Sequence, residues 1–329
     1  EMCIRDRAEP TILAAMALEG ALGWPSSLHA RIGHPVGLFA KIITGCERAL
    51  NRPAWPDWQR RLAGLAAMLA LIVMAACVSA LAVLGVRAVA GNWAWAVLAL
   101  LAWPALAARS LDDHVRPVLA ALEAGDLVAA RRRVGMIVGR ETRDLDEAGV
   151  ARAAIESLAE SFCDGVAAPL FWLGLGGLPG VWAYKAINTA DSLIGHPEEP
   201  LRAYGWAAAR IDDLVNLIPA RLAGLLLCLV GGGGWGTMLR DHALHASPNA
   251  GWPEAAMAGV LGVRLAGPVR YDGVAADKPW IGREGGEAGA ADLRRALGVY
   301  RRACAALALG AWILGILGIL GIVGSAWQV

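Results

Sequence analysis

Three groups of polar residues interrupt an otherwise apolar sequence, and they contain the side chains that could do chemistry. The first group has a four-residue spacing and consists of Arg152, Glu156, Glu160 and Asp164. In a helix this spacing places the four side chains nearly along one stripe. A line of carboxylates suits Mg²⁺, which takes oxygen ligands in nucleotide-using enzymes. The plainer interpretation is a solvated face with favourable Arg–Glu pairs, which is the commoner role of such charges.

Two further polar groups adjoin apolar stretches. The earlier one contains Lys185, Asn188, Thr189, Asp191 and Ser192. The later one contains Arg210, Asp212, Asp213, Asn216 and Arg221. Carboxylates at the start of a helix are stabilised there, so capping is one explanation for the aspartates. Ionisable residues beside membrane segments are costly and usually functional, however, and three such groups in one chain favour a functional role.

A fourth segment, Ser247–Glu254, is rich in Pro and Gly and includes Asn249. Pro253 suits the first turn of a helix, which we predict over Ala255–Val263. The start of that helix could bind a phosphate, because its backbone N–H groups point outward.

Several familiar motifs are absent from the sequence. The glycines at 231–234 are not followed by the lysine of a P-loop, and no dinucleotide-binding, zinc-protease or nucleophile-elbow motif occurs. The six cysteines form no C-x-x-C pair, which indicates neither a zinc site nor a disulfide framework. The isolated histidines favour structural roles. A net charge of +1 without a basic block argues against a nucleic-acid partner.

The elements that must position these residues are helices in a membrane. The chain is 57% hydrophobic and 18% charged, with a mean hydropathy of +0.48, whereas soluble domains are about 45–50% apolar and about 25% charged. Three uncharged stretches are candidate membrane spans: Leu62–Val86, Asn92–Ala108 and Ala303–Val329. We therefore predict an all-α, polytopic integral membrane protein, with lipid as a partner.

Two other apolar stretches are broken by glycines. Gly165–Tyr184 is interrupted at Gly176–Gly180, and Leu222–Leu239 carries the glycines at 231–234. Non-helical backbone at membrane depth is tolerated only where protein or a wet cavity covers it. We predict that Gly165–Tyr184 is re-entrant or deeply buried, and that Leu222–Leu239 is either re-entrant or paired with a further crossing. Thr11–Leu22 is a shorter apolar segment that contains a glutamate.

The distribution of arginine predicts the orientation. The segment Arg109–Asp164 holds eight arginines, whereas the link between the first two candidate spans holds only Arg87. Arginine-rich loops stay in the cytoplasm. We predict that this cytoplasmic loop, 109–164, is helical and belongs to a single membrane-embedded domain over 11–329. Residues 1–10 form a separate leader that need not be native.

Five segments together resemble a known family. They are GHPVGLFAKIITGCERALN (33–51), IVGRETRDLDEAGVARAAIESLAES (137–161), DGVAAPLFWLGLGGLPGVWAYKAINTADSLIG (164–195), GWAAARIDDLVNLIPARL (205–222) and SPNAGWPEAAMAGVLGVRLAGP (247–268). In this order they resemble the adenosylcobinamide-phosphate synthases of cobalamin biosynthesis, and the resemblance extends from about Thr11 to Arg302.

The resemblance implies an inner-membrane enzyme that uses ATP and Mg²⁺. Members join the propionate carboxylate of adenosylcobyric acid, a corrinoid, to the amine of aminopropanol phosphate or a related amino alcohol, and the product is adenosylcobinamide phosphate. Because ATP is cytoplasmic, the active site would face the cytoplasm. The oligomeric state stays open, a homo-oligomer included.

The reactants are all negatively charged, so we expect Arg, Lys and Mg²⁺ around them. The candidate catalytic residues are Glu141, Glu156, Glu160, Asp191, Asp212 and Asp213. The candidates for binding ATP and substrate are Arg140, Lys185, Asn188, Ser192, Arg210 and Asn249. The candidate Mg²⁺ ligands are Glu156, Glu160, Asp164 and Asp191.

Two departures from the family pattern bear on the activity. Ser161 stands where the family usually has Asn, and the segment 18–25 lacks an acidic residue beside Trp24. A corrinoid transporter is a rival class, because transporters use broken helices, but it would favour inverted repeats that this sequence lacks. A non-catalytic membrane sensor, as in a related family linked to β-lactamase regulation, would favour loss of the carboxylates.

Overall fold

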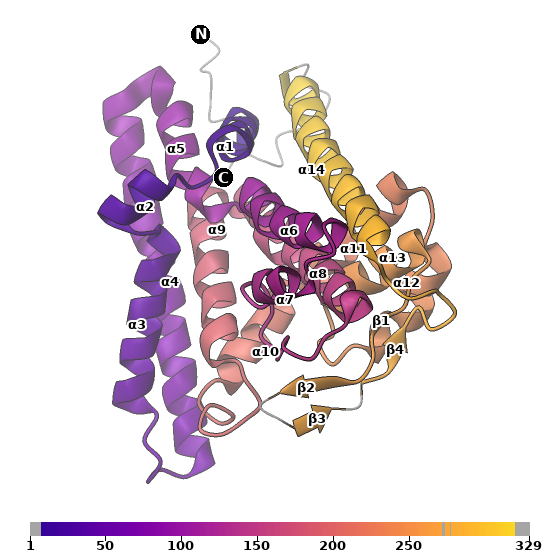
Figure 1. Ribbon diagram of the computed structural model, residues 1–329. Coiled ribbons are helices and arrows are strands. Elements are labelled where there is room, and N and C mark those ends of the chain that lie inside the picture. The colour runs from indigo at the N-terminus through magenta and orange to yellow at the C-terminus, as the bar shows by residue number, and fades with distance from the viewer. Residues whose placement is uncertain (1–7, 272–273, 277, 320–329) are drawn as a thin grey trace. The chain divides into compact units, whose positions relative to one another are not determined.

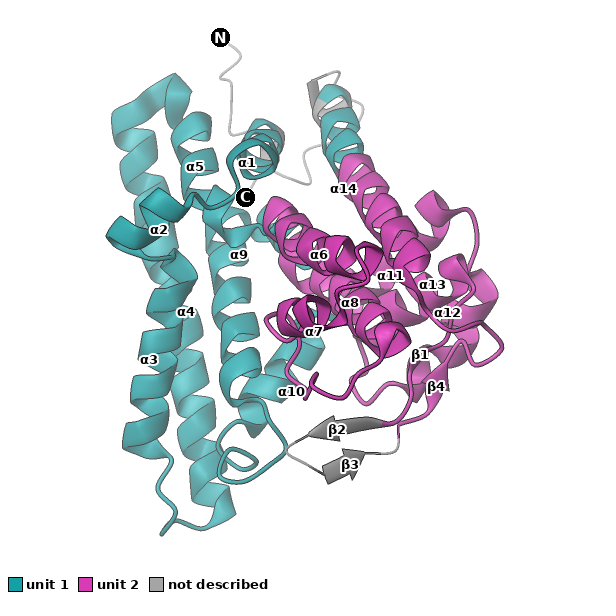
Figure 2. Cartoon of the chain, viewed as in Figure 1, with its two compact units in different colours: residues 1–107, 168–216, 308–329 teal, residues 108–167, 217–307 magenta. Residues whose placement is uncertain are grey.

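The computed structural model describes residues 8–271, 274–276 and 278–319 (Figure 1). The chain forms two compact units (Figure 2). The first contains Glu1–Ala107, Ala168–Asn216 and Ala308–Val329, and the second contains Ala108–Ala167 and Leu217–Leu307. The single domain over 11–329 stays a prediction, and residues 109–164 lie in the second unit. Most of the predicted leader lies outside the described residues.

The first unit is helical. Its elements are α1 (Ala8–Leu22), α2 (Ser26–Ile32), α3 (Pro35–Leu50), α4 (Asp57–Ala90), η1 (Gly91–Trp93), α5 (Ala94–Ala102), η2 (Trp103–Ala105), α9 (Ala168–Ile194), α10 (Trp206–Val215) and the end of α14 (Ala290–Ile319). Helices α3, α4, α9 and α10 share an apolar core that includes Met68, Leu71, Ile187 and Tyr204. The outer face of α4 leaves residues such as Leu81 exposed, which suits contact with lipid.

The second unit combines helices with two short strand pairs. Its elements are α6 (Ala108–Glu123), α7 (Leu127–Val134), α8 (Glu147–Phe162), the π-helical turn η3 (Cys163–Ala167), α11 (Leu217–Gly231), α12 (Trp235–Asp241), η4 (His242–Leu244), α13 (Gly251–Leu261), β1 (Leu265–Ala266), β2 (Val269–Tyr271), β3 (Val274–Ala276), β4 (Trp280–Ile281) and most of α14. Strand β1 pairs antiparallel with β4, and β2 with β3. These strands are a difference from the all-α prediction.

Helix α8 is the central element of the second unit. The predicted apolar stripe of Val150, Ala154, Leu158 and Phe162 is fully buried, and α6, α7, α13 and β1 pack around the helix. Burying a large apolar side chain contributes about 1.5–3 kcal/mol, so this stripe fixes the orientation of α8. The polar side of α8 is thereby turned toward the loops that surround it.

Helix α9 contains the predicted break. Gly177 has φ +59° and ψ −151°, which is not helical, and the helix resumes after it. A Cβ on Gly180 would lie 2.4 Å from the carbonyl oxygen of Trp172. Residues eight apart in a straight helix are separated by about 12 Å, so the chain turns sharply here. The break is confirmed; its depth in a membrane stays a prediction.

Three helical stretches are long and apolar enough to cross a membrane, judged by length and composition: Asp57–Glu123, Glu147–Ile194 and Ala290–Leu314. The helices Trp206–Val215 and Leu217–Gly231 qualify as a fourth only if counted as one bent span. The predicted span Leu62–Val86 lies inside α4. The predicted span Asn92–Ala108 is shorter than expected, because α5 has nine residues between two 3-10 turns.

Candidate functional site

Glu156 lies near the middle of α8 and holds two segments from elsewhere in the second unit. Its Oε2 accepts a hydrogen bond of 2.7 Å from an Nη atom of Arg140. Its Oε1 accepts one of 2.7 Å from the backbone N–H of Ala266 and lies 4.0 Å from Nε of Arg152. The side chains of Arg140 and Glu156 are only 9% and 13% exposed. This is a buried ion pair, and such pairs persist only when further hydrogen bonds satisfy the charges.

The loop that carries Arg140 is tied to α7 and α8. Arg131 donates to the carbonyl of Leu145, and Ser157 donates to the carbonyl of Ile137. Asp146 caps α8 by accepting from the N–H of Gly149 at 2.7 Å, as N-cap aspartates do. These contacts fix the loop at both ends, so Arg140 reaches Glu156 from a held backbone.

Strand β1 supplies the backbone N–H of Ala266, which donates to Glu156. Ala266 has φ +57°, a conformation uncommon for a residue with a side chain. Gly267 follows with φ +78°, and a Cβ there would lie 2.6 Å from the indole of Trp280. Backbone strain of this kind is concentrated at functional sites. Here it accompanies the hydrogen bond from Ala266 to Glu156 and close packing of Trp280.

Two arginine side chains lie over the indole ring of Trp280. The guanidinium of Arg152 lies 4.9 Å from the centre of the indole, and that of Arg264 lies 4.6 Å from it. Arginine over tryptophan is a favourable cation–π arrangement. Arg264 also forms an ion pair with Glu287. The second unit therefore gathers Arg140, Arg152 and Arg264 around Glu156 and Trp280; we call these five residues the arginine cluster.

Glu254, near the start of α13, is a buried acid beside this cluster. It is 3% exposed, and its Oε1 lies 3.5 Å from Nε2 of His245. Burial raises the pKa of Glu254 well above its ordinary value, and the charges of Glu156 and Glu160 raise it further against the opposing Lys278 and Arg140. The Nδ1 of His245 accepts from the N–H of Ser247, so its Nε2 carries the proton in the neutral ring.

These acids suit a divalent cation in type but are not a complete cage. Among the described residues, no three His, Cys, Asp or Glu side chains are arranged to hold one metal ion. Mg²⁺ usually takes one or two protein carboxylates together with water and substrate phosphates. The repulsion that Glu156 and Glu160 exert on Glu254 would be relieved by a cation. The donor set therefore fits Mg²⁺ held partly by a phosphate ligand.

Several predicted site residues of the first unit contact one another within a single helix. Lys185 donates to the side chain of Asn188 at 3.2 Å, and Ser192 donates to the carbonyl of Asn188 at 2.9 Å. Arg210 pairs with Asp213 three residues later, at 2.9 Å. Lys185 also lies near enough to His34 for its charge to act on that ring.

A hydrogen-bond network in the first unit joins α9 to α10 through predicted site residues and their neighbours. The hydroxyl of Tyr184 in α9 donates to Oδ1 of Asn216, and the amide of Asn216 donates to Asp212 at 2.9 Å. All three side chains are buried. Buried polar groups that satisfy one another specify a single packing arrangement. This network ties α9 to the end of α10.

The predicted residues thus fall into two sets. The second unit holds Arg140, Glu141, Glu156, Glu160, Asp164 and Asn249. The first unit holds Lys185, Asn188, Asp191, Ser192, Arg210, Asp212 and Asp213. Of the predicted residues, Arg140 and Glu156 are brought into direct contact from separate segments. Asp164 lies in η3 and departs from the regular stripe of α8, and Glu141 is exposed. Asn249 is buried and accepts from Arg221.

The sequence prediction missed four residues of this region: His245, Glu254, Arg264 and Trp280. Glu254 was assigned only to the start of a helix, and α13 does begin near it, at Gly251. Arg264 and Trp280 flank short strands that had no periodic pattern to reveal them. The signal that was available is the type of residue: an acid inside an otherwise apolar helix is costly unless it has a role.

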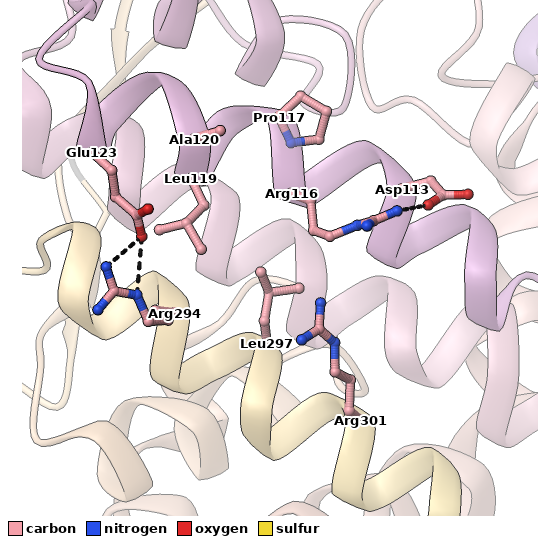
Figure 3. Close-up of a pocket in the computed structure, with 9 residues that line it drawn as sticks. All are labelled: Asp113, Arg116, Pro117, Leu119, Ala120, Glu123, Arg294, Leu297 and Arg301. Atoms are coloured by element: carbon pink, nitrogen blue, oxygen red, sulfur yellow. Dashed lines mark hydrogen bonds and ion pairs between the residues drawn. The ribbon is translucent and has the colours of Figure 1, made fainter.

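A second group of arginines lines a groove between α6 and α14 (Figure 3). The groove measures about 510 Å³. Arg294 pairs with Glu123 at 2.8 Å, Arg301 pairs with Asp112 at 2.7 Å, and Arg116 pairs with Asp113. The charges of this groove are neutralised within the protein.

Comparison with known proteins gives a consistent family. The family model described as CobD/Cbib protein matches residues 12–300. The cobalamin biosynthesis protein CobD of Rhodobacter capsulatus is 48% identical over 302 residues, covering 91% of this chain and 94% of that protein. Proteins of the same name from a Sinorhizobium species and Brucella suis are 44% and 45% identical, covering 89% and 86% of this chain and 94% and 89% of their own lengths. No solved structure matches. The chain therefore belongs to the CobD/Cbib protein family.

Proposed function

We propose that this protein acts in cobalamin biosynthesis as an ATP-dependent, amide-forming ligase of the inner membrane. It would join adenosylcobyric acid to aminopropanol phosphate, or a related amino alcohol, to give adenosylcobinamide phosphate. Membership of the CobD/Cbib family supports the pathway. The observation that carries the chemistry is the buried Arg140–Glu156 pair with Arg152 beside it, because buried arginines suit phosphate-bearing reactants.

The reaction needs activation because a carboxylate oxygen is a poor leaving group. In the first step the substrate carboxylate attacks the terminal phosphorus of ATP; an O–P bond forms, and ADP leaves with the electrons of the broken P–O bond. In the second step the neutral amine attacks the carbonyl carbon; the C–N bond forms, and the C–O bond to phosphate breaks. One amine proton leaves with the phosphate as the amide forms.

The protein's part in such a reaction is mainly positioning and charge neutralisation. We assign Arg140 and Arg152 to the transferred phosphate. Magnesium, when bound, would neutralise the phosphate oxygens, with Glu160 and Asp164 as its protein ligands. Glu156 orients Arg140 and the backbone of Ala266, since both its oxygens already accept hydrogen bonds. Asp191, Lys185 and the other candidates of the first unit stay proposed site residues with no reactant assigned to them.

The location follows from the same reasoning. Apolar helices such as α4 and α14 are suited to crossing the bilayer. ATP is cytoplasmic, so the arginine cluster would face the cytoplasm. Labelling of single cysteines placed near Asp146 and near Asn188 from each side of sealed vesicles tests this. Accessibility from opposite sides would contradict a shared cytoplasmic face.

The direct test uses the purified protein in lipid nanodiscs with adenosylcobyric acid, aminopropanol phosphate, ATP and Mg²⁺. We expect one ADP and one phosphate per amide formed, with no ATP consumption when the corrinoid is omitted and none after chelation of Mg²⁺. Product is identified by mass spectrometry. Binding of the corrinoid without any turnover, in a protein shown to be folded, would contradict the ligase proposal and favour a transporter or a sensor.

A further inference from the structure

We propose that Arg140, Arg152 and Arg264 form a binding site for a phosphate ester, with Trp280 holding two of the three guanidiniums. Arg264 and Trp280 are not among the residues that the sequence pointed to. The inference rests on the proposed function only for the identity of the ester, which would be ATP or the amino-alcohol phosphate. The site itself follows from the contacts of the second unit.

The first argument concerns charge. Two buried guanidiniums, those of Arg140 and Arg152, share the single carboxylate of Glu156. Arg264 pairs with Glu287, whose side chain is 61% exposed, and an exposed partner contributes little. Arg140 and Arg264 are both close enough to Arg152 to repel its charge. An anion bound among the three would relieve that repulsion.

The second argument concerns unsatisfied donors. The Nε atoms of Arg140, Arg152 and Arg264 are all buried, and none has a hydrogen-bond partner within the described part of the chain. Buried donors in folded proteins nearly always have partners, and each exception calls for an explanation such as a missing ion or ligand. Three such exceptions in one cluster of like-charged side chains point to an oxyanion.

The arginines of the groove between α6 and α14 can be compared with those of the arginine cluster. The groove also gathers three arginines, but Arg294 donates from Nε to Glu123 (Figure 3), and Arg301 donates from Nε to Asp112. The side chains of Arg294 and Arg301 are 67% and 55% exposed, so water reaches them as well. Clustering of arginine therefore does not by itself bury guanidinium donors in this protein. Among the described residues, the buried guanidinium Nε atoms without a partner are those of Arg140, Arg152 and Arg264.

The third argument concerns preorganisation. Arg152 and Arg264 both lie against the indole of Trp280, and Trp280 lies against Gly267, where a side chain would collide with the ring. A stacked guanidinium loses rotational freedom but keeps its N–H groups at the edge of its plane. That edge matches two phosphate oxygens, as in bidentate arginine–phosphate contacts. Trp280, in β4, thus holds the planar guanidiniums of Arg152 and Arg264 in fixed positions.

The test measures binding rather than turnover. Protein in nanodiscs is titrated calorimetrically with two probes separately: the magnesium complex of a non-hydrolysable ATP analogue, and aminopropanol phosphate. We expect Arg152→Gln and Arg264→Gln to weaken one of the two by about 10- to 100-fold, as for lost hydrogen bonds to a charged group. The affected probe identifies the source of the phosphate. Arg294→Gln, the matched control in the groove, should bind both probes as the parent does.

Two further variants show whether a loss of binding comes from the lost contact or from misfolding. Arg264→Lys keeps the charge but not the fork, so it should bind less tightly than the parent while melting at a similar temperature. Trp280→Leu should weaken binding of the same probe, because it removes the stacking surface. If folded Arg152→Gln and Arg264→Gln both bind the two probes within about twofold of the parent, the site is refuted.

The binding result can be separated from the fate of the ligase proposal. Arginine-dependent phosphate binding in a protein that makes no amide would leave the site standing and reject the proposed function. If Arg264→Gln forms the amide with parental KM values for ATP and aminopropanol phosphate, the proposed function stands and the binding site is rejected.

Discussion

Two hydroxyl residues of the first unit and Glu156 of the second differ in how far their hydrogen bonds reach along the chain. In the first unit, Thr189 and Ser192 bond to carbonyls four residues earlier in α9. In the second unit, Glu156 holds Arg140, 16 residues away, and Ala266, 110 residues away. Contacts within one helix turn form wherever such residues sit in a helix. Long-range polar contacts exist only because the fold assembles them, so they are the better guide to a built site.

The largest expected effect that tests this difference is on Arg140. Arg140→Gln leaves Glu156 buried without its partner, and removal of one member of a buried pair costs about 3–5 kcal/mol of unfolding free energy. Arg210→Gln removes an exposed guanidinium that pairs with the partly buried Asp213 of the first unit, and it should cost about 1 kcal/mol or less. Thermal melting in nanodiscs compares them. Equal losses in the two variants would remove the distinction between the units.

A smaller effect is expected at the network of Tyr184, Asn216 and Asp212 in the first unit. Asn216→Ala removes the hydrogen bonds that Asn216 makes with the hydroxyl of Tyr184 and with Asp212, all buried. Each lost hydrogen bond costs about 0.5–1.5 kcal/mol, so the melting temperature should fall measurably. Asn216→Asp keeps an acceptor for Tyr184 but places a carboxylate beside Asp212, and it should be no more stable than the alanine variant. Unchanged melting in both would mean that the network contributes nothing.

His34 gives a pH-dependent prediction for the first unit. Burial, together with the charges of the nearby Lys185 and His29, lowers the pKa of His34 to about 4. The unfolded chain titrates near 6.5, so it binds the proton more readily than the folded protein does between these values. Stability should therefore fall as the pH drops from about 6.5 toward 4.

The matched variant is His34→Asn, which can still cap α3 as His34 does but does not titrate. We expect its melting temperature to fall less than the parent's between pH 7 and pH 5. His29→Gln, at an exposed position, should follow the parent. A parental pH dependence in His34→Asn would show that the charge of His34 plays no part.

The smallest effect is expected for Thr189→Ala. Its hydroxyl bonds the carbonyl of Lys185 on the same helix, and such back-bonding adds little to helix stability. The unfolding free energy should change by less than about 0.5 kcal/mol. A loss comparable with that of Asn216→Ala would show that local contacts in α9 matter more than their geometry indicates.

Features that depend on neighbouring residues could be predicted from the sequence, whereas features that depend on distant residues could not. The break within Gly176–Gly180 depends on neighbours in sequence, and the structure confirms it at Gly177. The apolar stripe of α8 and the capping of α7 by Asp126 depend on neighbouring residues in the same way. The strand pair β1–β4 could not be foreseen, because each strand has two residues and no periodicity. Glu254 and Trp280 depend on that pairing or on burial in α13, which no spacing reveals.

The four-residue spacing of the charged residues predicted their placement on one helix only in part. The stripe of Arg152, Glu156, Glu160 and Asp164 assumed one continuous α-helix. Helix α8 ends at Phe162, and Asp164 lies in the π-helical turn that follows. A π-helical turn shifts the facing of the residues after it. The first three positions hold to the α-helical pattern, and the fourth does not.

The most direct test of the central claim is the rate of ATP-dependent amide formation by Glu156→Gln beside Glu123→Gln. Glu156 organises the arginine cluster, whereas Glu123 pairs with Arg294 in the groove of the same unit. We expect Glu156→Gln to lower kcat/KM by at least about 100-fold, as for loss of a group that positions transition-state contacts, and Glu123→Gln to retain nearly the parental rate. Equal rates for the two variants would contradict the assignment of the reaction to this cluster.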